Sequence, residues 1–116
     1  MTQVTIFHNP RCSKSRETLA LLESKGVEIQ IVEYLKQVPD AATISELLAK
    51  LGISARELMR TKEEEYKAQG LNNPELTEAQ LIAAMVATPK LIERPIVLAK
   101  GKAAIGRPPE NVLAIL

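Results

Sequence analysis

Apolar and polar residues alternate along the chain with two different periods, and these periods predict its elements. Apolar residues concentrate at 4–7, and residues 27–31 alternate apolar with polar, so both stretches predict short strands. Between them, residues 13–25 carry Leu19 and Leu22 on one face at helical spacing. A strand, a helix and a second strand within about 35 residues indicate a βαβ unit with parallel strands.

The middle of the chain has helical periodicity. Thr43, Ser54 and Thr77 are each followed three residues later by Glu or Gln, and each precedes an apolar stripe. We therefore expect three capped helices, and we expect the part from about 54 to 90 to be a helical insertion. The acidic run at 63–65 is typical of a solvated helix face.

The pattern becomes strand-like again near the end of the chain. An apolar run at 96–99 suits a buried strand, residues 100–102 suit a tight turn, and 103–105 return as a second strand. A final helix is expected over 110–116, after a proline pair that its first turn tolerates. The order β-α-β-α, a helical middle, then β-β-α predicts an α/β, thioredoxin-like fold with a mixed four-stranded sheet.

Composition limits the classes of function. A chain of 116 residues has the size of one domain, so a single domain over 1–116 is expected. A net charge of +1 predicts no general affinity for nucleic acid or for membrane surfaces, and no apolar run approaches the ~18 residues of a membrane span. One cysteine and one histidine exclude an internal disulfide and argue against a metal site. A free thiol and an N-terminus that leads directly into a strand indicate the cytoplasm.

Cys12 follows the first predicted strand and precedes the first predicted helix, so it is the candidate nucleophile. Unpaired N–H groups and the positive end of the dipole at a helix N-terminus stabilise a thiolate. Arg11, Lys14 and Arg16 add positive charge, and His8 can add more or accept a proton. A lone cysteine is more commonly a buried filler, but polar and cationic neighbours favour a reactive thiol here.

Arg60, Arg94 and Arg107 each lie at the edge of a predicted element. A guanidinium group presents a planar fork of donors that matches tetrahedral oxyanions. Three such groups around a thiolate would bind a dianion or trianion and stabilise charge that builds on its oxygens. Each also fits an ordinary surface arginine, and the spacing alone does not bring them together.

The chain contains three separated motifs: His8-Asn9-Pro10-Arg11-Cys12-Ser13-Lys14-Ser15-Arg16, Glu93-Arg94-Pro95-Ile96-Val97 and Gly106-Arg107-Pro108-Pro109-Glu110. Together these motifs resemble the glutaredoxin-coupled arsenate reductase family. The resemblance covers essentially the whole chain. Because the sequence ends at Leu116, soon after the last predicted helix, we expect it to be closer to a shorter chromosomal subgroup of that family.

The resemblance implies a thioredoxin-like fold and the reduction of arsenate to arsenite. By the same resemblance Cys12 is the nucleophile, His8 and Ser15 support its thiolate, and the oxyanion is bound by Arg60, Arg94 and Arg107. Pro95 stands before the third strand, where a thioredoxin-like fold has a cis-proline facing the catalytic cysteine. No bound cofactor is expected. Glutathione would be the co-substrate and glutaredoxin the protein partner, because Cys12 has no second cysteine to pair with.

Two other functions stay open. Cys12-Ser13-Lys14-Ser15 also resembles a one-cysteine glutaredoxin motif, which indicates a glutathione-linked thiol–disulfide oxidoreductase without arsenate activity. One branch of the superfamily consists of redox-sensing regulators that bind RNA polymerase. That branch typically carries a Cys-x-x-Cys pair, whereas this chain has Ser15 at the second position.

Overall fold

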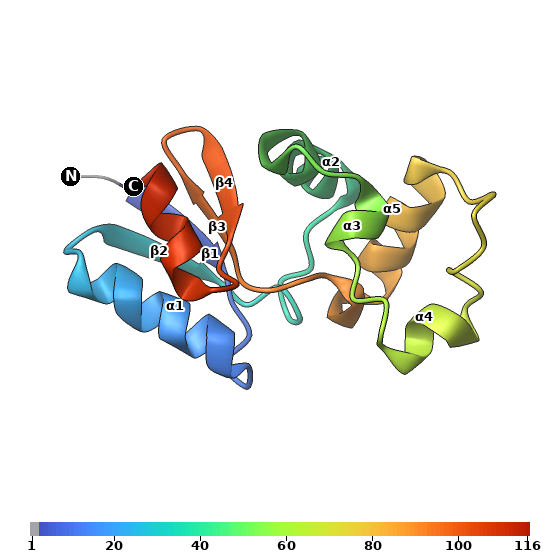
Figure 1. Cartoon of the computed structure of the whole chain (residues 1–116), viewed down its shortest axis with the longest axis horizontal. Helices are drawn as coiled ribbons and strands as arrows, with labels where there is room; N and C mark the ends of the chain where they lie inside the picture. Colours follow the sequence, from blue (N-terminus) through green and yellow to red (C-terminus); the bar gives the residue numbers. More distant parts are fainter. Residues whose placement is uncertain (1–2) are drawn as a thin grey trace. The chain divides into compact units, whose positions relative to one another are not determined.

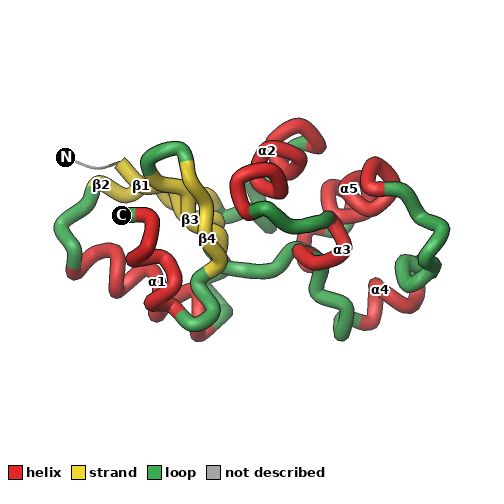
Figure 2. Tube along the Cα trace, turned by 45° about the horizontal axis from the view of Figure 1, so that its top comes forward, coloured by secondary structure: helices red, strands yellow, loops and turns green. Residues whose placement is uncertain are grey.

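The computed structural model describes residues 3–116, whose contacts form two compact units (Figures 1 and 2). The first unit comprises the described part of Met1–Gln37 together with Arg94–Leu116, and the second comprises Val38–Glu93. The second unit thus begins before the helical insertion expected from about 54. A single domain over 1–116 and that insertion boundary stay predictions.

The first unit is built on a mixed four-stranded sheet with the order β2-β1-β3-β4. Strand β1 (Gln3–Phe7) pairs in parallel with β2 (Glu28–Val32), and the connection between them contains α1 (Ser13–Ser24). On its other side β1 pairs antiparallel with β3 (Ile96–Ala99), which pairs antiparallel with β4 (Lys102–Ile105). This topology confirms the predicted thioredoxin-like α/β fold.

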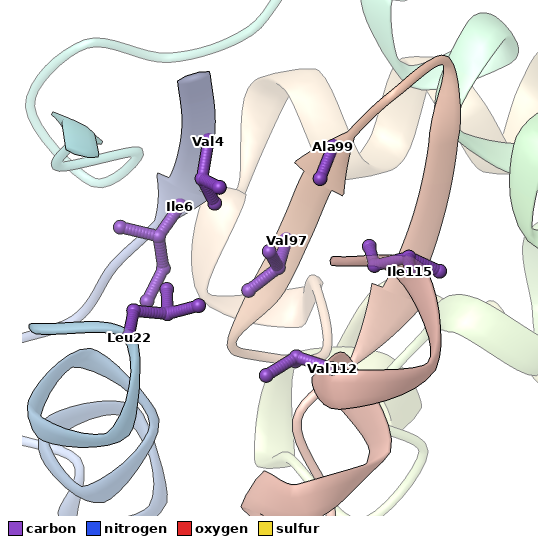
Figure 3. Packing of buried hydrophobic residues seen from close by; sticks show 7 residues of the cluster. All are labelled: Val4, Ile6, Leu22, Val97, Ala99, Val112 and Ile115. Atoms are coloured by element: carbon purple, nitrogen blue, oxygen red, sulfur yellow. The ribbon is translucent and has the colours of Figure 1, made fainter. Parts of the chain in front are cut away.

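An aliphatic core fills the first unit, and only 3% of the residues of the chain are aromatic. Side chains from β1, β3, α1 and η2 (Pro109–Ile115) meet in it, and Figure 3 shows them: Val4, Ile6, Leu22, Val97, Ala99, Val112 and Ile115. Full burial of one such large aliphatic side chain contributes about 1.5–3 kcal/mol. The segment that supplies the last two is a 3₁₀ helix, where the sequence predicted a helix over 110–116.

The predicted hairpin of β3 and β4 has a two-residue turn. Lys100 and Gly101 both have positive φ, at 53° and 75°. A tight turn with positive φ at both central positions matches the right-handed twist of the flanking strands. Glycine adopts this conformation without steric cost, so Gly101 accounts for the local reversal of the chain.

The second unit is helical. Its elements are α2 (Ala41–Leu51), α3 (Ala55–Leu58), α4 (Glu64–Ala68), α5 (Glu78–Ala87) and the 3₁₀ helix η1 (Pro89–Leu91). The predicted capping boxes at Ser54 and Thr77 are both present, and each closes with reciprocal hydrogen bonds to the residue three positions later. Over the described residues 3–116, no helix combines the length and the apolar character that crossing a membrane requires.

The start of α2 differs from the prediction. Thr43 was expected to cap this helix, but the N-cap is Asp40, whose carboxylate accepts a hydrogen bond of 2.8 Å from the Thr43 backbone N–H. The helix therefore begins at Ala41 and includes Thr43 in its first turn. Aspartate is at least as good an N-cap as threonine, and its carboxylate also interacts favourably with the helix dipole.

Candidate active site

Cys12 is the N-cap residue of α1 and has an extended backbone. Its N–H donates to the Asn9 carbonyl at 3.0 Å, and its own carbonyl accepts from the Arg16 N–H at 3.0 Å. The Asn9 side-chain oxygen in turn accepts from the Arg11 N–H at 3.0 Å. These bonds fix the loop from β1 to α1, so the sulfur lies at the N-terminus of the helix with 8% of the residue exposed.

The surroundings of Cys12 lower the pKa of its thiol below the ordinary value. Burial acts in the opposite direction and raises the pKa, because it disfavours the charged thiolate. The backbone N–H groups of Ser15 and Lys14 donate hydrogen bonds to the sulfur, and the positive charges of Arg94 and Arg107 attract the thiolate. Together these four groups outweigh burial, so the thiolate population at neutral pH is larger than for an ordinary cysteine.

Arg107 makes the direct contact between a guanidinium group and the nucleophile. Its Nη2 donates to Cys12 Sγ at 3.4 Å, while its Nε donates to the Arg94 carbonyl at 2.6 Å. The Asn111 side chain donates to the Arg107 carbonyl at 3.0 Å. The Arg94–Pro95 peptide bond is cis, which is the geometry expected before β3, and the Arg107–Pro108 bond is also cis. The chain thus brings two of the three candidate arginines to the same sulfur.

His8 and Ser15 form a buried hydrogen-bonded pair. His8 Nδ1 lies 2.7 Å from Ser15 Oγ, and the Asn9 N–H donates to the same oxygen at 3.0 Å. Burial lowers the pKa of His8, Glu33 opposes this shift and Arg16 adds to it. His8 is therefore neutral at neutral pH and does not add the positive charge that the sequence allowed. Ser15 supports the thiolate through its backbone N–H, while its hydroxyl holds the turn.

Thr18 and Gly106 were not identified from the sequence, yet they hold the site together. The Thr18 hydroxyl lies 2.8 Å from the Lys14 carbonyl oxygen and 3.4 Å from that of Gly106. The Gly106 N–H donates to the Pro95 carbonyl at 3.0 Å. A Cβ at Gly106 would lie 2.5 Å from Thr18 Oγ1, so only glycine lets the segment before Arg107 approach α1 so closely. The sequence signal was a glycine directly before a candidate arginine.

Arg60 belongs to the second unit and lies in an ionic cluster there. Its guanidinium group forms an ion pair with Glu63. The Nζ of Lys90 lies 3.9 Å from the Glu63 carboxylate and 2.9 Å from that of Glu65. The acidic run is thus ion-paired at two of its three positions. The expected convergence of Arg60 on Cys12 stays a prediction.

The chemistry available in the first unit is that of an activated thiolate beside two guanidinium groups. The sulfur can attack an electron-poor centre, and the arginines can bind an anion and neutralise charge on its oxygens. Among residues 3–116, no group of three or more His, Cys, Asp or Glu side chains is arranged to hold a metal ion. The residues present fit a nucleophile with an oxyanion site.

Comparison with known proteins adds a family. The sequence profile of the ArsC family matches residues 7–115. A relative from Escherichia coli (strain K12), named Uncharacterized protein YfgD, is 62% identical over 115 residues, which cover 98% of this chain and 97% of the relative. The arsenate reductase of Neisseria meningitidis serogroup B is 51% identical and covers 100% of both chains. The solved structure of the arsenate reductase from Vibrio cholerae has a TM-score of 0.97 at 51% identity and covers 99% of this chain and 98% of its own.

Proposed function

This chain belongs to the ArsC family, and from that premise we propose that it reduces arsenate to arsenite with the Cys12 thiolate as the nucleophile. The observation that carries the proposal is the 3.4 Å contact between Arg107 Nη2 and Cys12 Sγ. This contact places the nucleophile next to a cation that can bind an anionic substrate. The names of the relatives from Neisseria meningitidis and Vibrio cholerae support arsenate as the oxyanion.

The first step binds and activates the oxyanion. Arg94 and Arg107 attract the arsenate dianion, and their donors match its tetrahedral oxygens. The Cys12 thiolate attacks arsenic, an oxygen leaves as water after protonation, and a sulfur–arsenic bond forms while arsenic stays pentavalent. The two guanidinium groups stabilise the charge that builds on the remaining oxygens. Arg60 is the proposed third ligand of the anion.

Reduction requires a second thiol. Cys12 is the only cysteine of the chain, so a dithiol within the chain cannot supply the two electrons. Glutathione thiolate attacks the Cys12 sulfur, and the sulfur–arsenic bonding pair passes to arsenic, which leaves as arsenite. Cys12 is then in a mixed disulfide with glutathione, and glutaredoxin reduces that disulfide by thiol–disulfide exchange. The cytoplasm, which keeps glutathione reduced, is the proposed compartment.

His8 and Ser15 are proposed as positioning residues. The 2.7 Å bond between their side chains and the Asn9 N–H bond fix the first turn of α1. The Ser15 N–H then stays directed at the sulfur, where it favours the thiolate. Because burial lowers the pKa of His8, the pair performs this role with a neutral imidazole.

An arsenate reduction assay with glutathione, glutaredoxin, glutathione reductase and NADPH tests the proposal. Arsenate-dependent NADPH oxidation is expected for the wild type and not for Cys12→Ser. Arg107→Ala should lose about 2–4 kcal/mol of transition-state stabilisation, the contribution of one oxyanion donor. Arg107→Lys should stay well below the wild type, because an ammonium group cannot replace the planar fork.

Two further measurements separate the rival functions. Turnover of a model glutathione mixed disulfide without any turnover of arsenate would indicate the thiol–disulfide oxidoreductase instead. Absence of both activities, together with retention of RNA polymerase on the immobilised protein, would indicate the regulator. Cys12→Ser should abolish either activity, which assigns any turnover to this chain.

A further inference from the structure

A cavity of about 190 Å³ lies in the first unit beside the loop that leads to Cys12. Its lining comes from two segments, the β1–α1 loop and the residues that follow β2. The residues used below are Asn9, Pro10 and Arg11 from the first segment, and Glu33, Leu35 and Lys36 from the second. His8 also lines the cavity, and the proposed mechanism places no ligand in it.

The cavity walls carry charges of both signs. The Glu33 carboxylate lies 3.8 Å from Lys36 Nζ, and Arg11 supplies a second cation. An α-amino acid bears an ammonium and a carboxylate on one carbon, so its ammonium suits Glu33 and its carboxylate suits the two cations. A ligand with carboxylates alone would place negative charge against Glu33. The charge pattern therefore favours a zwitterionic α-amino acid group.

The size of the cavity and its apolar wall further limit which ligands fit. Pockets for drug-sized molecules occupy roughly 300–1,000 Å³, so this cavity takes one end of a tripeptide and not the whole of it. Pro10 and Leu35 offer apolar surface for methylene groups. In glutathione the γ-glutamyl end has an ammonium, a carboxylate and two methylenes, whereas the glycyl end has only a carboxylate. The γ-glutamyl end fits the lining.

The cavity is joined to the nucleophile through a fixed loop. Arg11 precedes Cys12 in the chain, and the Cys12 N–H donates to the carbonyl of Asn9 at 3.0 Å. The Asn9 side-chain oxygen accepts from the Arg11 N–H at 3.0 Å. In glutathione the cysteine directly follows the γ-glutamyl group. A γ-glutamyl group bound in the cavity therefore brings its neighbouring sulfur towards the loop that holds Cys12.

We propose that this cavity binds the γ-glutamyl end of glutathione, with Glu33 holding its ammonium and with Lys36 and Arg11 holding its α-carboxylate. This inference rests on the proposed use of glutathione as the second thiol. The site accounts for how a chain with one cysteine selects glutathione among small thiols. Glu33 and Lys36 are 42% and 79% exposed, so each ion pair should contribute modestly.

The test uses disulfide exchange, which needs no arsenate. The Cys12 thiolate attacks one sulfur of glutathione disulfide, a Cys12–glutathione disulfide forms and one glutathione thiolate leaves. The rate is compared with that for bis(hydroxyethyl) disulfide, which is neutral, and for dithiodipropionate, which carries carboxylates without ammonium groups. Intact-mass spectrometry of quenched samples gives the rate of each adduct. The neutral disulfide reports any change in thiolate reactivity itself.

Glu33→Gln is the decisive variant because the proposed site and a general charge effect predict opposite changes in the rate of reaction with glutathione disulfide. Glutathione disulfide and dithiodipropionate are both net anions, so loss of one negative charge would by itself speed the reaction with both. If Glu33 binds the ammonium group, its loss should instead lower the rate with glutathione disulfide about two- to five-fold, the range for one exposed ion pair. The rate with dithiodipropionate, which has no ammonium group, should not fall. Lys36→Gln and Arg11→Gln should each slow glutathione disulfide more than the neutral disulfide.

Lys25→Gln is the matched control. It removes one exposed lysine from the first unit at the C-cap of α1, about 20 Å along the helix from Cys12. Its three rates should equal those of the wild type. An equal acceleration of both anionic disulfides by Glu33→Gln, or an equal effect of Lys25→Gln and Lys36→Gln, would overturn the site. If the variants change the rates with the three disulfides as expected but the wild type does not turn over arsenate, the proposed function is wrong and the glutathione site stands.

A second measurement needs no variant. S-methylglutathione keeps the γ-glutamyl end but has no thiol, so it should slow alkylation of wild-type Cys12 by the neutral reagent iodoacetamide. S-methylcysteine, whose ammonium and carboxylate sit directly on the sulfur-bearing residue, should protect less at the same concentration. Equal protection by both compounds, or by neither, would exclude γ-glutamyl recognition.

Discussion

The reactivity of Cys12 is the net result of opposed effects on a single residue. Burial raises the pKa of its thiol, while the N–H groups of Ser15 and Lys14 and the charges of Arg94 and Arg107 lower it further than burial raises it. The sequence predicted the helix N-terminus and the local cations. It could not identify Arg107 as a direct contact, because 95 positions separate the two residues and only the folded sheet brings them together.

The rate of Cys12 alkylation should therefore follow a pH profile shifted to lower pH. Only the thiolate reacts, so the rate rises through the thiol pKa, and the inflection should lie below the ~8.5 of an ordinary cysteine. Arg107→Gln removes one of the charges that favour the thiolate, so its inflection should move to higher pH. Iodoacetamide trapping between pH 5 and 10 measures both profiles. An inflection at or above the ordinary value in the wild type would refute the lowered pKa.

The position of Gly106 requires a residue without a side chain. A methyl group there would lie 2.5 Å from Thr18 Oγ1 and 2.9 Å from the Pro95 ring. Gly106→Ala should therefore lower the free energy of unfolding by about 1–3 kcal/mol, the range for overpacking. Thr18→Ala removes the nearest atoms, so the double variant should lose less than the sum of the two single losses. Urea unfolding of the four proteins gives the coupling, and strict additivity would contradict the clash.

At the scale of elements, sequence patterns located helices more reliably than they located their ends. The capping boxes at Ser54 and Thr77 were predicted and are present, because each pairs a hydroxyl with a side chain at the fixed position three residues later. At α2 the N-cap is Asp40, three residues before the predicted N-cap Thr43. Both Asp40 and Thr43 are residue types that cap helices well. The backbone conformation before the helix decides which of them is the N-cap, and the apolar periodicity of the sequence does not report that conformation.

The link between α3 and α4 carries the next prediction, because it contains the ion pair of Arg60 and Glu63. If Arg60 is a ligand of the oxyanion, as proposed, the Glu63 carboxylate competes with arsenate for it. Glu63→Gln should therefore lower the KM for arsenate about two- to five-fold and change kcat little, in keeping with one partly exposed ion pair.

Glu64→Gln is the matched control for that variant, since it removes the neighbouring charge of the same acidic run. Its KM for arsenate should stay at the wild-type value. Steady-state kinetics over a range of arsenate concentrations separates KM from kcat. An increase in KM with Glu63→Gln would mean that the carboxylate positions Arg60 for the anion and does not compete with it.

At the scale of the whole molecule, the order of the elements was enough to predict the thioredoxin-like sheet. A βαβ unit and a hairpin leave few ways to arrange four strands, and the observed order β2-β1-β3-β4 is one of them. The sequence could not show which arginines approach the sulfur, since that depends on packing between distant segments. Arg94 and Arg107 act on Cys12, whereas Arg60 forms its ion pair with Glu63 within the second unit.

The last prediction follows from the cysteine content of the whole chain. Reduction of arsenate takes two electrons, which in the proposed reaction a pair of thiols supplies when it becomes a disulfide. Cys12 is the only cysteine, and Ser15 stands where a two-cysteine motif has its second thiol, so the partner thiol must come from outside the chain. A single turnover with arsenate and glutathione, without glutaredoxin, should leave one glutathione attached to Cys12.

Intact-mass spectrometry under non-reducing conditions should detect one adduct per chain, and Cys12→Ser should have none. Omission of arsenate should also leave the wild type unmodified, because reduced glutathione alone cannot oxidise a thiol. Addition of glutaredoxin should then remove the adduct by exchange at the mixed disulfide. Sustained turnover of arsenate with thioredoxin and its reductase as the only thiol source would show that glutathione is not the resolving thiol. In that case the electrons would reach Cys12 from a protein dithiol.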